Sequence, residues 1–134
     1  MLLGSRVVYV RRDPRDVALS CFKNNLTWPF SDLDAIGDYL AACERLMKHA
    51  ANVLPIAMHT VEYETLIADP EAESRRLIEF CGLSWNEACL QPPSGDRSVR
   101  TPSKSQVRRP FYQSSVGAWQ RYESFLRKHA GWID

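Results

Sequence analysis

One short segment of the chain, Arg11–Ser20, gathers arginine, aspartate and serine side chains. Arg12 stands where a run of β-branched and aromatic residues ends, and Ser20 follows it eight positions later. An arginine fork matches phosphate oxygens, and a serine hydroxyl adds one more donor. The free N–H groups and the dipole at the start of a helix also favour an anion. The segment therefore predicts a phosphate-binding turn between a strand and a helix.

The same residues allow a second interpretation. Arg12 and Arg15 can pair with Asp13 and Asp16 as a solvated charge cluster, because surface ion pairs form readily and contribute little. The formal net charge is +1, which gives no reason to expect a nucleic acid or a membrane as partner. Any anion site must therefore come from local placement of basic residues, not from the total charge.

The surrounding pattern predicts the elements that position these residues. Val7–Val10 is apolar at consecutive positions and predicts a buried, central parallel strand. Asp13 as N-cap and Pro14 as first helical residue begin a helix to about Asn24. Its predicted apolar face consists of Val17, Ala18, Cys21 and Phe22.

Later elements follow the same logic. The pattern predicts a helix from Asp32 or Asp34 to Val53, a strand over 56–61, a helix from Asp69 to Cys81 closed by Gly82, a short helix over 85–90, a loop over 91–107 and a helix over 116–128. This order indicates an α/β fold with a parallel sheet flanked by helices. Ligands of such sheets bind beyond the carboxyl ends of the strands, here at 11–14 and 62–64.

Two of these segments resemble a known family. Residues 8–20 are similar to the 3′-phosphate-binding motif of sulfotransferases that use PAPS (3′-phosphoadenosine-5′-phosphosulfate). The resemblance implies that Arg12 and Ser20 hold the 3′-phosphate of PAPS or of its product PAP. Residues 61–83 resemble the segment that follows in that family, which implies that Tyr63 closes on the adenine. A tyrosine ring and hydroxyl suit a purine, although a half-buried tyrosine at a strand end is the simpler alternative.

A third segment resembles a narrower group. Residues 99–119 are similar to the C-terminal motif of tyrosylprotein sulfotransferases and of bacterial tetratricopeptide-linked sulfotransferases. The resemblance implies that Ser103 lies against the nucleotide and the reacting sulfuryl group. Gln106 would continue that wall, and Arg108 or Arg109 would add positive charge. The alternative for this stretch is a flexible basic loop.

The resemblance runs from about Arg6 to Tyr122 and implies the C-terminal part of a single sulfotransferase domain over 1–134, with a partial P-loop-type sheet. The family's N-terminal 5′-phosphosulfate loop has no counterpart here, since Gly4 is the only glycine before residue 37 and no lysine precedes Lys23. The family's catalytic base lies in that same part, so we expect no transfer by this chain alone. Asn24 and Ala118 replace basic residues of the family's motifs.

The expected function is therefore part of a sulfotransferase that moves a sulfuryl group from PAPS to an acceptor hydroxyl. Protein tyrosine is one such acceptor, and a small alcohol, a sugar and a lipid are others. The resemblance implies no metal, and we expect neither nucleic acid nor membrane as partner. The four cysteines show no metal or CxxC spacing, which favours thiols in the cytoplasm. A non-catalytic nucleotide-binding remnant and an interaction domain are the alternatives.

Overall fold

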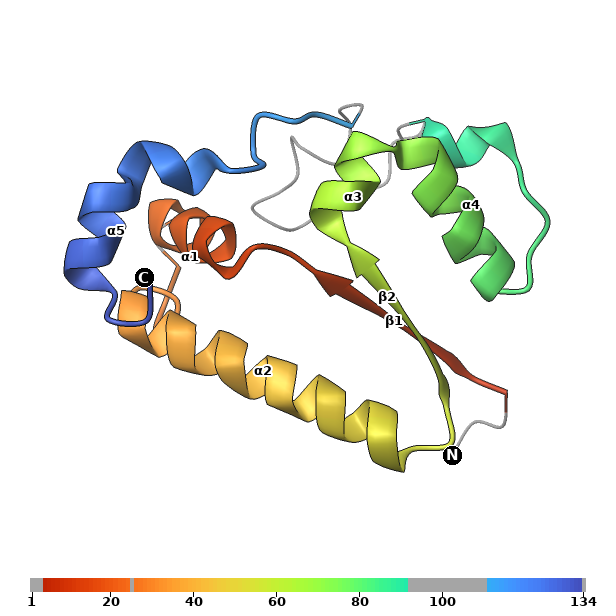
Figure 1. The fold of residues 1–134 in the computed structure, drawn as a ribbon, viewed down its shortest axis with the longest axis horizontal. Helices are drawn as coiled ribbons and strands as arrows, with labels where there is room; N and C mark the ends of the chain where they lie inside the picture. Colours follow the sequence, from red (N-terminus) through yellow and green to blue (C-terminus); the bar gives the residue numbers. More distant parts are fainter. Residues whose placement is uncertain (1–3, 25, 92–110, 134) are drawn as a thin grey trace.

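The computed structural model describes residues 4–24, 26–91 and 111–133. Its sheet contains β1 (Arg6–Arg11) and β2 (Ala57–Glu62), which pair in parallel. Arg6 lies opposite Ala57 and Arg11 opposite Glu62, so both strands end at the same level. The residues that follow the two strands consequently meet at one edge of the sheet (Figure 1). The predicted α/β class with a parallel sheet is confirmed.

Helices make up most of the remaining described chain. They are α1 (Pro14–Lys23), α2 (Leu33–Val53), α3 (Tyr63–Ala68), α4 (Pro70–Phe80) and α5 (Glu123–His129), with the 3-10 helices η1 (Glu87–Leu90) and η2 (Ala118–Tyr122). Aspartate caps α1, α2 and α4: Asp13, Asp32 and Asp69 accept hydrogen bonds from N–H groups in the first turns. The predicted N-caps are therefore correct. The helix predicted over 116–128 is instead two pieces, η2 and α5, and α3 was not predicted.

Helices cover the two faces of the sheet unequally. The Tyr9 hydroxyl donates to Glu44 of α2 at 3.1 Å, whereas the His59 ring stacks on Phe80 of α4 at 5.0 Å. Because Val8 pairs with His59, Tyr9 and His59 point to opposite faces, and the sheet lies between α2 and α4. In the described chain α4 packs mainly against β2. Val10 is accordingly 58% exposed, so the prediction of a buried first strand is wrong for this face.

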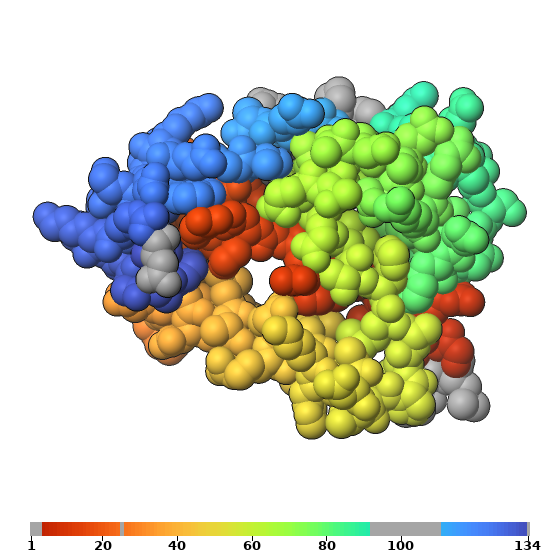
Figure 2. Space-filling model, in the orientation of Figure 1, coloured from red at the N-terminus to blue at the C-terminus, as the bar shows by residue number. Residues whose placement is uncertain are grey.

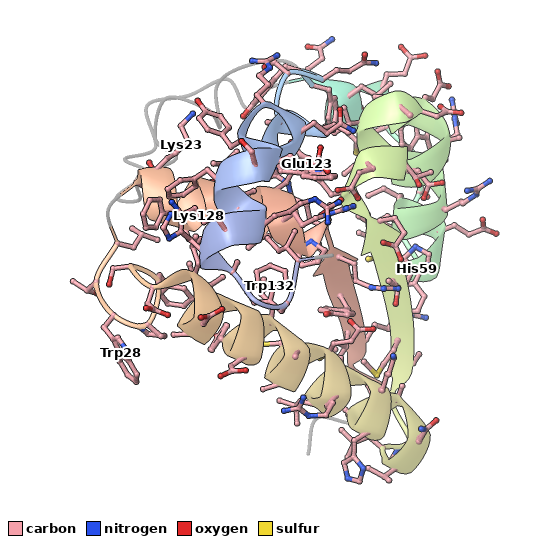
Figure 3. All side chains as sticks on the ribbon, turned by 60° about the vertical axis from the view of Figure 1, so that its left-hand side comes forward. Lys23, Trp28, His59, Glu123, Lys128 and Trp132 are labelled. Atoms are coloured by element: carbon pink, nitrogen blue, oxygen red, sulfur yellow. The ribbon has the colours of Figure 1, made fainter. Side chains whose placement is uncertain are left out.

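The hydrophobic core lies among the helices, where α1, the start of α2, η2 and α5 meet (Figure 1). Its members are Ala18, Leu19, Leu33, Ile36, Trp119, Leu126, Ala130 and Ile133. Trp132 closes this core against α2, and its indole N–H donates to the Leu33 carbonyl at 2.9 Å (Figure 3). Gly37 is required there, because an added Cβ would lie 2.3 Å from the Trp132 indole nitrogen. The side chain of residue 37 must therefore be absent for the chain end to dock.

This packing corrects the predicted apolar face of α1 and leaves most of α2 uncovered. On α1 the buried residues are Asp16, Ala18 and Leu19, while Phe22 is 41% exposed. On α2 only the first turns are buried, and Leu46 is 64% exposed. A cavity of about 650 Å³ lies between α2 and β1 and is lined in part by Tyr9, Leu40 and Glu44. Figure 2 shows an opening between α2 and the elements above it.

None of the described helices combines the length and the apolarity that a bilayer-crossing segment needs.

Candidate nucleotide site

A cavity of about 390 Å³ lies between α1 and the segment that precedes η2. Arg12 and Ser20 both line it, as do Lys23, Asn24 and Tyr112. Lys23 stands in the last turn of α1 (Figure 3). The structure thus brings together the two residues that the sequence pairs at a spacing of eight. The volume falls within the range of roughly 300–1,000 Å³ typical of small-molecule sites.

Arg12 joins three separate parts of the chain at one edge of this cavity. Its Nη2 donates to the Ser115 carbonyl at 2.7 Å, and its guanidinium carbon lies 4.7 Å from the centroid of the Tyr63 ring. The hydroxyls of Tyr63 and Ser115 share a hydrogen bond of 2.9 Å. The ends of β1 and β2 and the segment around Ser115 therefore hold one another in place.

The Arg12 guanidinium keeps unused donors. Among the described residues, its only hydrogen-bond acceptor is the Ser115 carbonyl, and its buried Nε–H has no partner. Buried polar groups in native proteins are nearly always hydrogen-bonded, so an orphaned arginine donor beside a cavity needs an explanation. A bound anion provides one, because phosphate oxygens match the arginine fork.

The start of α1 is built around Asp13. Its carboxylate caps the helix and binds Arg15 twice, at 3.0 Å to Nε and 2.7 Å to Nη2. Arg15 also lies over the Trp119 ring, with 3.8 Å from the guanidinium carbon to the ring centroid. Partial burial opposes ionisation of Asp13, but the hydrogen bonds and charge of Arg15 outweigh it and hold the pKa of Asp13 below its ordinary value.

The charge-cluster interpretation is therefore right for one pair only. Asp13 and Arg15 do form an ion pair. Arg12 instead faces the cavity, and Asp16 is 2% exposed and bonded to backbone N–H groups of residues 117 and 119. These charges hold elements together and are not a solvated surface.

Residues 4–87, more than half of the chain, match the sequence model of the family described as the Sulfotransferase family. The chain belongs to the sulfotransferase family. A protein of Aquifex aeolicus (strain VF5), described as uncharacterized, is 35% identical to this sulfotransferase chain over 132 residues, 94% of it. A solved structure titled "Sulfotransferase Domain from the Curacin Biosynthetic Pathway" has a TM-score of 0.65 at 19% identity and covers 95% of the chain. Its likeness shows a shared fold.

The chain spans only part of these relatives. It covers 17% of the Aquifex protein and 55% of the chain in the solved structure. The activity, substrates and partners of the whole protein are consequently proposals.

Not every predicted site residue can be located in this sulfotransferase chain. Ser103, Gln106 and Arg108 lie outside the described residues, so their roles stay predictions. Ser115 was not predicted, although it contacts both Arg12 and Tyr63. Asp16 was considered only as a surface charge, although its spacing from buried Leu19 places both on one side of α1. That spacing is a signal in the sequence that could have revealed its burial.

We expect Asp13→Asn to lower the free energy of unfolding by about 1 kcal/mol near neutral pH, and by progressively less in acid. Asparagine still caps the helix, but it loses the charge that holds Arg15. Because the pKa of folded Asp13 lies below its ordinary value of 3.8, its contribution is complete above that value and is lost as the pH falls through the lower folded pKa. Urea denaturation of the parent and of Asp13→Asn, from pH 7 down through this range, measures the difference in their free energies of unfolding.

Asp32→Asn is the matched control, since Asp32 caps α2 at 2.8 Å and has no arginine partner among the described residues. It reports the cost of exchanging the cap alone. If the stability difference between the parent and Asp13→Asn stays constant down to the lowest pH, the assigned ion pair is contradicted.

Proposed function

We propose that this chain binds the 3′-phosphate and adenine of PAPS and PAP, as part of a sulfotransferase that moves a sulfuryl group to an acceptor hydroxyl. The observation that carries the proposal is the shared cavity of Arg12 and Ser20, together with the unused donors of Arg12. Membership of the sulfotransferase family supports the nature of the anion.

In this proposal the 3′-phosphate lies in the cavity of about 390 Å³. Arg12 offers its guanidinium donors and Ser20 its hydroxyl. Lys23 adds a second positive charge at the end of α1, where Asn24 cannot supply one. The Asn24 amide nitrogen is moreover engaged by the Ser20 carbonyl at 2.8 Å. Lys23 therefore compensates for the neutral residue beside it.

Tyr63 is the proposed adenine contact. Its hydroxyl bonds Ser115 and one face of its ring carries the Arg12 guanidinium, so the ring orientation is fixed from two sides. A fixed aromatic ring loses little conformational freedom when a purine packs against it. The contact between Arg12 and Tyr63 also links the phosphate and adenine parts of the proposed site.

PAPS supplies the activated sulfuryl group, and the residues of this chain bind and orient the nucleotide that carries it. Holding one reactant in a fixed geometry lowers the entropic part of the barrier for in-line transfer. The described residues include no base assigned to the acceptor, in keeping with the family's placement of that group in another part of the domain. The proposed acceptor is a hydroxyl, and protein tyrosine follows from the resemblance of residues 99–119. We propose the cytoplasm as location, which the four free cysteines support.

Calorimetric titration with PAP and with adenosine 5′-phosphate (AMP) tests the proposal. The two ligands differ by the 3′-phosphate, so we expect PAP to bind roughly 100-fold more tightly, as for a phosphate held by charge-assisted hydrogen bonds. Equal affinities for PAP and AMP would overturn the assignment of the cavity. PAP binding without transfer, even in a longer protein that contains the whole domain, would instead favour the non-catalytic alternative.

A further inference from the structure

Asp16 is a buried carboxylate whose ligands come from the other end of the chain. Only 2% of its surface is exposed. Its Oδ2 accepts the N–H of Gly117 at 2.7 Å, and its Oδ1 accepts the N–H of Trp119 at 2.9 Å. Its sequence separation from these donors is 101 and 103 residues.

This arrangement satisfies both partners. Burial of a charged carboxylate is unfavourable unless hydrogen bonds replace its water. The first N–H groups of a helix lack acceptors within the helix, and Gly117 and Trp119 stand at the start of η2. Asp16 therefore caps a second helix from within the first turn of α1, and the two helix starts are fixed relative to each other.

The backbone around Gly117 is shaped for this contact. Gly117 has a φ of +66°, a left-handed conformation that residues with a Cβ adopt at a cost. An added Cβ would meet the side chain of Gln120 at 3.7 Å, an ordinary contact, so the conformation and not the space restricts this position. The chain turns here so that the N–H of Gly117 points at Asp16.

Ser115 lies two residues before this turn. Its carbonyl accepts from Arg12 and its hydroxyl bonds Tyr63, the two side chains proposed to hold the nucleotide. Movement of the turn would carry Ser115 with it and release both. A residue that fixes the turn thus also fixes the orientation of Arg12.

We propose that Asp16 is a positioning residue for the 3′-phosphate: it anchors the turn at Gly117 so that Ser115 holds Arg12 toward the cavity. This role rests on the proposed function. Asp16 lines the same cavity but its oxygens are committed to backbone N–H groups, so it acts through Arg12 and not on the ligand. It makes recognition of the 3′-phosphate depend on a segment about one hundred residues further along the chain.

The test is a double-mutant cycle on the full chain, read as the ratio of the AMP and PAP dissociation constants. Asp16→Asn keeps one acceptor oxygen but places its amide N–H₂ against the other N–H donor, and we expect the ratio to fall about ten-fold. In an Arg12→Ala background the same change should leave the ratio unaltered, because Arg12 no longer needs positioning. If Asp16→Asn lowers the ratio by the same factor in the parent and in Arg12→Ala, the positioning role of Asp16 is overturned.

Glu73→Gln is the matched control, since Glu73 is also a buried carboxylate, 7% exposed, but lies in α4 and pairs with Arg76. It should keep the parental ratio. Gly117→Ala disturbs the same contact at its donor and should lower the ratio as Asp16→Asn does. Agreement between the two variants makes a folding defect in one of them an insufficient explanation.

Two failures are distinguishable. A parental ratio in Asp16→Asn, alongside a collapsed ratio in Arg12→Ala, would leave the nucleotide site in place and overturn the role of Asp16. A parental ratio in Arg12→Ala would overturn the proposed site itself, and the role of Asp16 with it.

Discussion

Arg12→Ala is expected to weaken PAP binding roughly 100-fold and to leave AMP binding nearly unchanged, since hydrogen bonds to charged groups contribute about 1.5–3 kcal/mol each and a tenfold change corresponds to about 1.4 kcal/mol. The loss should concern the 3′-phosphate alone, because Arg12 lines the cavity that Ser20 shares. Calorimetric titration of the purified variant with both nucleotides measures the two constants separately.

Two further variants identify the cause of that loss. Arg12→Lys keeps the charge but loses the planar fork, so we expect an affinity between those of the parent and the alanine variant. Arg127→Ala is the control for a general loss of positive charge, because Arg127 is exposed in α5 and pairs with Glu123 at 2.9 Å. An equal loss of PAP affinity in Arg127→Ala would mean that net charge, and not the cavity, attracts the nucleotide.

Features that depend on neighbouring residues could be predicted from the sequence. The Asp–Pro pairs at 13–14 and 69–70 begin helices, because an aspartate cap and a proline at the first helical position act within one turn. Gly82 ends α4 with a φ of +73°, as a glycine after a helix predicts. The second strand and the position of Tyr63 at its end follow from similarly local patterns.

Features that depend on distant residues could not be predicted in this way. The burial of Asp16 requires donors that lie more than one hundred positions away. The apolar stripe of α2 continues to Leu46, yet its burial depends on which element packs there, and among the described residues only the first turns are covered. Helical spacing identifies an apolar face but does not say how far along the helix a neighbour extends. Exposure of Val10 on β1 has the same origin, since α4 packs on the adjoining strand.

The site itself combines both kinds of information. Arg12 and Ser20 are eight positions apart on one strand–helix unit, so their common cavity follows from local geometry. Ser115 enters the site only through long-range packing, and its segment is attached by Asp16, Arg15 and Trp119. The motif at the start of α1 thus lines the cavity and also binds the segment around Gly117 and Trp119.

Trp119→Ala is expected to lower the free energy of unfolding by about 3–5 kcal/mol, the cost typical of truncating a large core aromatic. Trp119 is 8% exposed and packs in the core formed by α1, α2 and α5. The change also removes the surface on which the Arg15 guanidinium rests. Urea denaturation followed by circular dichroism measures the difference, because the ellipticity of the helices does not depend on the tryptophan that is removed.

Trp28→Ala is the matched control, since Trp28 is 78% exposed and projects from the molecule (Figure 3). Its loss should change stability by no more than about 0.5 kcal/mol, as for most surface substitutions. Domains of this kind are stable by only about 5–15 kcal/mol, so the loss at Trp119 takes a large share of the total. A Trp119→Ala variant within about 1 kcal/mol of the parent would mean that η2 is not docked on α1 in solution. In that event Ser115 would no longer be held against Arg12, and the segment around residue 117 could not position the proposed phosphate site.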